Sequence, residues 1–178
     1  QDLTVYLDGA GNASITAADV DNGSTDNCTV ATLSLDQTSF TCADEGANTV
    51  SLTVTDQTGN FSSCTATITV VDTTSPVAVS QNINVYLDGN GAASISGSDV
   101  DGGSSDNCTV TNLSVSPSSF SCADEGANTV TLTVTDQAGN TNSSTATVTV
   151  IDSTAPTAVC QNLTIYLDGS GNASITAA

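Results

Sequence analysis

Two acidic loops of nearly identical sequence carry the residues best suited to chemistry. Each loop packs three aspartates beside a cysteine: Asp19, Asp21 and Asp26 in DVDNGSTDNCTV, and Asp99, Asp101 and Asp106 in DVDGGSSDNCTV. The chain of 178 residues has no Lys, Arg or His and a formal net charge of −19, so no side chain can neutralise these carboxylates. Clustered carboxylates without a base are typical ligands of a hard divalent cation such as Ca²⁺, which binds several oxygens in a flexible geometry.

The elements that must position these loops repeat along the chain. Gln1, Gln81 and Gln161 open three copies, and CADEGANTV occurs at residues 42–50 and again at 122–130. We therefore predict three units: residues 1–72 as the first repeat, 73–152 as the second, and 153–178 as the first hairpin of an incomplete third. An incomplete unit and a lone hairpin, which is marginal in water, lead us to expect a segment of a longer array.

Within each unit the apolar residues alternate with polar ones. The alternation covers residues 3–7, 13–17, 31–35, 50–54 and 66–70, with turn sequences such as DGAGN and DQTGN between them. We expect five clear strands, a weaker one near residues 38–42, and no helix. The predicted fold class is all-β: tandem Ig-like antiparallel β-sandwich domains arranged end to end. A chain that enters each domain at one pole and leaves at the other needs an odd number of strands, and the sequence leaves the missing strand unplaced.

In an Ig-like arrangement, the acidic loop, the last hairpin and the incoming linker share one pole of a domain. This places Asp99, Asp101 and Asp106 near Asp136 and Asp72, with the Asp44–Glu45 loop and the Asp8 turn of the previous unit approaching from the other side. We predict Ca²⁺ at such poles; the candidate ligands are Asp19, Asp21, Asp26, Asp44, Asp56, Asp72, Asp99, Asp101, Asp106, Asp124, Asp136 and Asp152. The alternative is that these are solvated turn aspartates screened by salt.

Six cysteines suggest two kinds of disulfide. Cys28 and Cys42 recur as Cys108 and Cys122, which predicts the bonds Cys28–Cys42 and Cys108–Cys122 within each unit. Cys64 and Cys160 are both replaced by serine in the second unit, at Ser144 and Ser80, as expected for a pair that joins the first and last strands. Their partners would then lie before Gln1 and after Ala178. Zinc is the weaker alternative, because the chain has no C-x-x-C motif and no His.

The stretch DNCTV…ANTVSLTVTDQTGNFSSCTATITVVDTTSP resembles the hyalin-repeat (HYR) family of Ig-like extracellular modules. The resemblance covers both full units and is closest to tandem arrays of large secreted bacterial surface proteins. It implies adhesion or a structural role rather than catalysis. It also implies a disulfide between the first and last strands at the positions of Cys64 and Cys160, from which the second unit departs at Ser80 and Ser144.

Three classes of function remain: a structural stalk or filament, an adhesin that binds surface carbohydrate or protein, and a non-catalytic piece of an enzyme. We favour a calcium-stiffened stalk or filament without catalysis, because no His or Lys base is available to activate a nucleophile. Expected partners are further copies of the same repeat, in a longer chain or as neighbouring subunits. The acidic charge argues against nucleic acid and against anionic membrane surfaces.

The predicted disulfides indicate an extracellular, secreted or cell-surface protein, in which sequon asparagines are candidate glycosylation sites. The sequon asparagines, several of which are expected by chance in a chain rich in Ser and Thr, are Asn12, Asn22, Asn27, Asn60, Asn107, Asn112, Asn142, Asn162 and Asn172.

Overall fold

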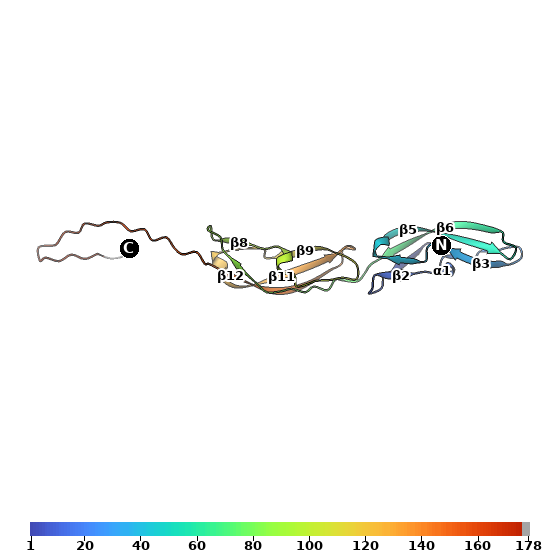
Figure 1. The fold of residues 1–178 in the computed structure, drawn as a ribbon, viewed down its shortest axis with the longest axis horizontal. Helices are drawn as coiled ribbons and strands as arrows, with labels where there is room; N and C mark the ends of the chain where they lie inside the picture. The colour runs from blue at the N-terminus through green and yellow to red at the C-terminus, as the bar shows by residue number, and fades with distance from the viewer. Residues whose placement is uncertain (176–178) are drawn as a thin grey trace.

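The computed structural model describes residues 1–175 and places two β domains in line along one axis, followed by an extended tail (Figure 1). The strands of the first domain are β1 (Leu3–Tyr6), β2 (Asn12–Ser14), β3 (Val30–Leu35), β4 (Ser39–Thr41), β5 (Gly46–Asp56) and β6 (Phe61–Val71). The strands of the second domain are β7 (Ile83–Tyr86), β8 (Ala92–Ser94), β9 (Val110–Ser116), β10 (Ser119–Ser121), β11 (Gly126–Asp136) and β12 (Thr141–Ile151).

Each domain is a sandwich of a four-stranded and a two-stranded sheet. The strand order is β1-β6-β5-β3 over β2-β4 in the first domain, and β7-β12-β11-β9 over β8-β10 in the second. The long hairpin β5–β6 forms the spine, with Val50 opposite Ala66 in its register. The predicted class, tandem Ig-like β-sandwich domains arranged end to end, is confirmed.

Each passage of the chain from one pole of a domain to the other is one crossing, and the number of crossings decides at which pole the chain leaves. β1 pairs with β6 in parallel, while β6–β5, β5–β3 and β2–β4 are antiparallel. The turn at Asp8, closed by the Asp8 N–H donating to the Asn12 carbonyl, reverses the chain before β2. It follows that β3 and β4 run in the same direction. Together they form one crossing, in which the chain moves from the four-stranded sheet to the two-stranded sheet. The domain therefore has five crossings, an odd number, and enters and leaves at opposite poles.

The alternating residues found in the sequence form the cores. Val50, Leu52, Ile68 and Val70 of the large sheet pack against Phe40 of β4 in the first domain. The second domain repeats this core, in which Val130, Leu132, Val134 and Val148 are fully buried. With few aromatic residues available, branched aliphatic side chains provide most of the buried apolar surface.

The expectation that no segment is helical was wrong. Short helices α1 (Ala17–Val20) and α2 (Gly97–Val100) follow β2 and β8, and 3₁₀ turns η1 (Cys42–Asp44) and η2 (Cys122–Asp124) follow β4 and β10. In α1 the Asp19 carboxylate accepts hydrogen bonds from the N–H and hydroxyl of Thr16, and Val20 is buried. A single capped turn is too short to produce a helical hydrophobic period, so the sequence pattern did not reveal it.

Residues 152–175 form an extended tail that leaves the second domain. The tail keeps the turn of the predicted third hairpin, because the Asp168 N–H donates to the Asn172 carbonyl, but no strand pairs around this turn within the described part. Its apolar side chains, including Val159, Leu163 and Leu167, are exposed. The predicted hairpin of 153–178 also includes residues 176–178, which lie outside the described residues. Among the residues described, no helix is long and apolar enough to cross a membrane.

We predict that Leu132→Ala lowers the free energy of unfolding of the second domain by about 2–5 kcal/mol, because it removes buried methyl groups and leaves a cavity. Its neighbour Thr131→Ala is the matched control: Thr131 lies on the exposed face of β11 and should change stability by less than about 0.5 kcal/mol. Chemical denaturation measures both. Equal effects of the two substitutions would contradict the assignment of the core face.

Candidate metal centre at the domain joint

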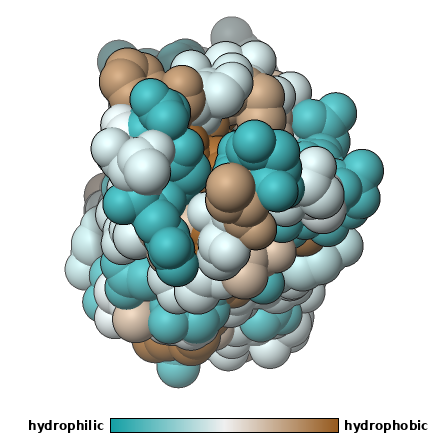
Figure 2. Space-filling view, turned by 90° about the vertical axis from the view of Figure 1, so that its right-hand side faces the viewer, coloured by the Kyte–Doolittle hydropathy of each residue, from teal (hydrophilic) through white to brown (hydrophobic). Residues whose placement is uncertain are grey.

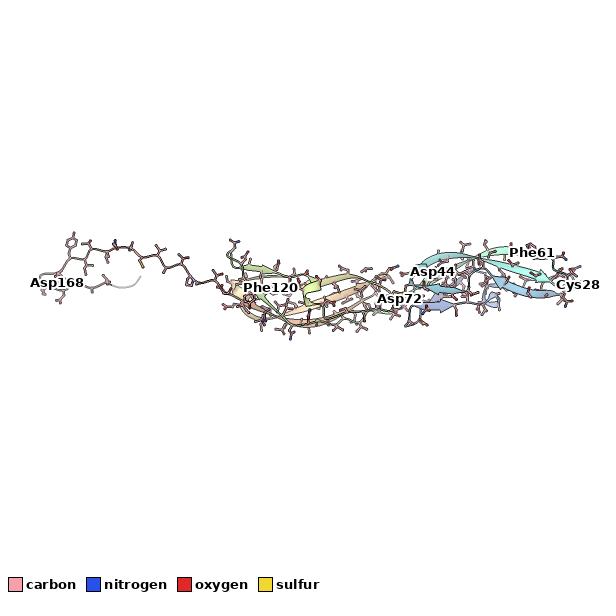
Figure 3. The ribbon with its side chains drawn as sticks, in the orientation of Figure 1. Cys28, Asp44, Phe61, Asp72, Phe120 and Asp168 are labelled. Atoms are coloured by element: carbon pink, nitrogen blue, oxygen red, sulfur yellow. A yellow bond between two sulfur atoms is a disulfide. The ribbon has the colours of Figure 1, made fainter. Side chains whose placement is uncertain are left out.

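A disulfide crosses the joint between the two domains. Cys42, at the start of η1, is bonded to Cys108 of the second domain's acidic loop, with a Cα–Cα distance of 5.5 Å. The predicted bonds Cys28–Cys42 and Cys108–Cys122 were therefore wrong, and Cys28 and Cys122 are exposed free thiols. Figure 3 shows the reason: Cys28 lies at the far pole of the first domain, whereas Asp44, two residues after Cys42, lies at the pole that faces the second domain. The sequence repeat relates positions in successive units, and the bond joins one unit to the next.

Gly11 allows the close approach that this bond requires. It has a φ of 74°, and a Cβ at this position would lie 2.6 Å from Cys42 Sγ and 2.8 Å from the Asn107 carbonyl oxygen of the other domain. Any side chain at Gly11 would therefore push the second domain away.

Two carboxylates meet beside the disulfide. Asp72, directly after β6, and Asp106, in the acidic loop of the second domain, have carboxylate oxygens within 4.8 Å of each other and of Cys108 Sγ. Asp72 is 3 % exposed and Asp106 is half-buried. Because Cys108 is oxidised, its sulfur is no thiolate ligand, and the chemistry of the pair is that of oxygen donors.

Two asparagine side chains connect the linker to the second domain. Asn107 Nδ2 donates to the Asp8 carbonyl and to Asp72 Oδ1, each at 3.2 Å. Asn140 Nδ2 donates to the carbonyls of Asp72 at 3.3 Å and Thr74 at 3.2 Å, and to Asp136 Oδ2 at 2.9 Å. The joint is therefore a polar contact held by amides, with Asp136 (2 % exposed) buried beneath it.

Three buried oxygens at this joint have no hydrogen-bond partner. They are Asp72 Oδ2, Asp106 Oδ1 and Asn107 Oδ1. A buried acceptor without a partner is costly, and two adjacent carboxylates add like-charge repulsion. Since the sequence has no basic side chain, only a proton or a cation from solution can neutralise the pair. The donor set, two carboxylates and one amide oxygen, fits a hard divalent cation.

The acidic loop of the second domain lies at the joint, and the equivalent loop of the first domain lies at a free pole. Comparing the two loops shows the effect of the contact between domains. Asp106, Asn107 and Cys108 are half-buried, while their equivalents Asp26, Asn27 and Cys28 at the far pole of the first domain are exposed. Asp72 and Pro76 of the linker are buried, while the equivalent Asp152 and Pro156 in the tail are exposed. The burial and the unpartnered oxygens at the joint therefore come from the contact between domains and not from the loop sequence itself.

The remaining predicted ligands have other local roles. Asp19 and Asp99 cap α1 and α2, Asp44 and Asp124 cap η1 and η2, Asp21 and Asp101 accept bonds within their loops, and Asp26 accepts the Cys28 N–H. Asp56 closes the far hairpin, and the Asp152 carboxylate accepts the Thr154 N–H. The structure thus brings together Asp72, Asp106 and Asp136 at the joint, with the Asp8 backbone, whereas the other aspartates shape turns.

Asn107 and Asn140 were missed as functional residues by the sequence analysis. Asn107 was assigned only as a glycosylation sequon, and Asn140 was seen only as part of a turn. The signal that could have identified them is the repeated pairing of an amide with an acid, in DNC and in DQ-x-GN. Of the other sequon asparagines, Asn142 donates to the Pro76 carbonyl at 2.8 Å and Asn60 to Asp56 Oδ2 at 2.8 Å, and the glycosylation of all nine stays a prediction.

The positions equivalent to Cys64 and Cys160 are close in the second domain. Ser80 Oγ donates to the Thr145 carbonyl at 2.7 Å, and the neighbouring Ser144 Oγ is buried without a partner. The pairing of the two cysteine positions, with partners outside residues 1–178, stays a prediction.

We predict that Gly11→Ala opens the joint and exposes Asp72 and Asn107. Gly91→Ala is the matched control, because Gly91 has a φ of 76° and its Cβ would lie 2.6 Å from Cys122 Sγ, but it faces no second domain. The Asn107 side-chain amide, which donates to the Asp8 carbonyl and to Asp72 Oδ1, should exchange its hydrogens at least about tenfold faster in Gly11→Ala than in Gly91→Ala, which corresponds to a loss of about 1.4 kcal/mol in protection. Equal exchange in both variants would show that the joint does not depend on this contact.

Acid should destabilise the first domain through Asp56. Hydrogen bonds from the Asn60 side chain, opposed by burial and reinforced by Thr58, lower the pKa of Asp56 from 3.8 to about 2. Because the folded pKa is below the unfolded value, this stabilisation is complete above about pH 4 and is lost as pH falls toward about 2. In melts recorded with a chelator, Asp56→Asn should flatten the fall in melting temperature over that window, while Gln57→Ala on the same turn should leave it unchanged. Curves of melting temperature against pH that run parallel for the wild type, Asp56→Asn and Gln57→Ala would contradict this role of Asp56.

Neither a protein-family model nor a curated protein matches the chain. Among solved structures, protocadherin gamma C5 EC1-3 is similar over 85% of this chain and 66% of its own, at 12% identity and a TM-score of 0.43. Human mucin-like protocadherin EC1-2 (86% and 97%, 10% identity, TM-score 0.40) and the Clostridium thermocellum CbhA fibronectin(III)-like modules (90% and 96%, 12%, 0.30) are also similar. The chain spans about half the length of another structure, protocadherin gamma B7 (49% of that chain, 11%, 0.37). These similarities concern tandem β domains and carry no conclusion about activity.

Proposed function

We propose that this chain is part of an extracellular structural rod, a stalk or filament in which Ca²⁺ bound at the domain joint stiffens a string of β-sandwich domains. The observation that carries the proposal is the group of three buried, unpartnered oxygens of Asp72, Asp106 and Asn107 at the joint of a chain that has no basic side chain.

Asp72, Asp106 and Asn107 would hold the cation. Two carboxylates and one amide oxygen match the charge and the hardness of Ca²⁺, and water can complete its coordination because Ca²⁺ tolerates irregular geometry better than Mg²⁺ does. When bound, the ion supplies positive charge between carboxylates that otherwise repel each other. The residues themselves come from both sides of the joint, so occupation of the site favours one orientation of the two domains.

The architecture suits a rod. The domains lie end to end (Figure 1), and each passes the chain from one pole to the opposite pole because β1 and β6 are parallel. The contact joins different surfaces of the two domains, and repetition of such a contact gives an open line rather than a closed ring or pair. The outer faces of the long strands carry mainly Ser and Thr, which favour solvent over side-by-side packing.

The disulfide supports the proposed compartment, and the residue types support the proposed function. A disulfide between domains is stable in an oxidising, extracellular setting. The resemblance of the sequence to hyalin repeats is in line with this setting. A role without catalysis agrees with the lack of any His or Lys base in the sequence.

We predict that calcium raises the melting temperature of the wild-type chain and that Asp106→Asn removes this effect. A ligand that binds only the folded state contributes about 2.7 kcal/mol at a concentration 100 times its Kd. Asp26→Asn is the matched control: it changes the equivalent residue at the far pole and should keep the full calcium effect. Calorimetric melts with calcium and with a chelator measure the difference.

Two results would contradict the calcium site. One is a melting temperature of the wild-type chain that does not respond to chelation, with no metal retained in elemental analysis. The other is an equal loss of the calcium effect in Asp106→Asn and Asp26→Asn, which would indicate diffuse screening of charge instead of a site at the joint.

An adhesin is the second candidate, and one observation favours it. Tyr6 and Tyr86 occupy equivalent positions on β1 and β7, and each is 62% exposed. Exposed tyrosines are common anchors at binding interfaces. Each domain offers a single such ring, so the structural role ranks first.

A further inference from the structure

The far pole of the first domain contains an open groove of about 370 Å³. It is lined by residues of the acidic loop, the last hairpin and β6, among them Asp26, Asp56, Asn60, Phe61, Ser63 and Cys64. Figure 3 places Phe61 and Cys28 at this end of the molecule, and Figure 2 shows the end face itself, where hydrophilic residues surround separate hydrophobic patches.

In the second domain the equivalent surface is occupied by the linker between the domains. Asn140, the counterpart of Asn60, donates to the Asp72 and Thr74 carbonyls. Asn142 donates to the Pro76 carbonyl, and the backbones of Val77 and Ser105 bond to each other in both directions at 2.7 and 3.1 Å. The groove of the first domain is therefore equivalent to the surface that holds the linker in the second domain.

A second linker of the same kind lies exposed at the other end of the chain. Residues 152–160 (DSTAPTAVC) correspond to residues 72–80 (DTTSPVAVS), and every residue from Asp152 to Cys160 is exposed. The local turn is already formed, because the Thr154 N–H donates to Asp152 Oδ1 at 2.8 Å, as the Thr74 N–H does to Asp72 Oδ1 at 2.9 Å.

The free cysteines at the two poles match the two halves of the existing disulfide. Cys122 Sγ lies 3.7 Å from the Gly91 carbonyl oxygen, the same distance that separates Cys42 Sγ from the Gly11 carbonyl oxygen. The Cys28 N–H donates to Asp26 at 2.8 Å, as the Cys108 N–H does to Asp106 at 3.0 Å. Cys122 and Cys28 thus present, on opposite poles, the geometry that Cys42 and Cys108 adopt at the joint.

We propose that the groove of the first domain binds residues 152–160 of a second copy of this chain, and that a Cys28–Cys122 disulfide closes the contact, so that copies join head to tail. The proposal rests on the proposed rod and extends it across separate chains. The new bond forms when the two thiols lose two electrons and two protons to a disulfide oxidant such as oxidised glutathione, which leaves as two thiols.

The same register places Cys160 beside Cys64, where Ser80 and Ser144 are neighbours in the second domain. Beyond this point the tail repeats the start of the chain: residues 161–175 differ from residues 1–15 at three positions. The tail can therefore pass outside Gln1 or replace β1 on β6, and both cysteine pairings are the same in either case.

The test uses the full chain, reduced and then oxidised with glutathione. Cys64→Ser/Cys160→Ser serves as the background, and peptide mapping separates a Cys28–Cys122 link from links through Cys42 or Cys108, which reduction also frees. We expect a ladder in non-reducing electrophoresis, a Cys28–Cys122 peptide after digestion with a protease that cleaves at acidic residues, and loss of the ladder on adding Cys122→Ser. A product that stays monomeric, or that contains Cys28–Cys28 and Cys122–Cys122 links as readily, would overturn the proposal.

The groove itself is tested by the rate of linking. Asn60→Ala should slow the formation of Cys28–Cys122 by about tenfold, because its counterpart Asn140 makes two hydrogen bonds to the linker. Thr58→Ala is the matched control, since Thr58 contacts Asp56 on the same turn but does not line the groove. Equal rates for the two variants would mean that the cysteines meet by collision and that the groove binds no linker.

Failure of this inference is distinguishable from failure of the proposed rod. In the Cys28→Ser/Cys122→Ser variant, the internal joint and its calcium response are measured in a chain that cannot link by this bond. A normal calcium response together with no specific linking in the other variants would remove the head-to-tail contact and leave the rod in place. Specific linking without a calcium response would remove the calcium-stiffened rod and leave the head-to-tail contact in place.

Discussion

The joint between the two domains depends on how the carboxylates of buried Asp72 and half-buried Asp106 are neutralised in a protein that has no basic side chain. Each has an oxygen without a hydrogen-bond partner, and Asn107 adds a third. Burial raises the cost of leaving these charges unpaired, and the disulfide Cys42–Cys108 together with the asparagine hydrogen bonds keeps them close. We propose that a divalent cation resolves this conflict and that the orientation of the domains then depends on the ion.

Because the sequence repeats, equivalent residues of the two domains can be compared within one chain. The pole formed by Asp106, Asn107 and Cys108 is closed by the neighbouring domain, and the equivalent pole formed by Asp26, Asn27 and Cys28 is open. The residue types are the same, so the difference in burial measures what the joint contributes. The same comparison connects the proposed calcium site to the assembly proposed at the open pole, where the groove, the exposed linker and the two thiols repeat the parts of the closed joint.

The sequence predicted the strands, because alternating residues such as Val50, Leu52 and Val54 form one buried face. It also predicted that Asp72, Asp106 and Asp136 lie at one pole. It was insufficient for the disulfide, because Cys28 and Cys42 are near in sequence but lie at opposite ends of the domain. It also missed α1, whose single turn has no period, and Asn107, whose role depends on a partner domain. The errors at the disulfide and at Asn107 share one cause: contacts between units are not encoded in the pattern of one unit.

A crystal structure of the chain grown with calcium, with anomalous scattering to identify the ion, tests the proposed calcium site at the joint most directly. We expect one Ca²⁺ at the joint, bonded to oxygens of Asp72, Asp106 and Asn107 at about 2.3–2.6 Å. A joint in which these three oxygens instead bond to water or protein donors, with calcium absent or found only on exposed turn aspartates, would contradict it.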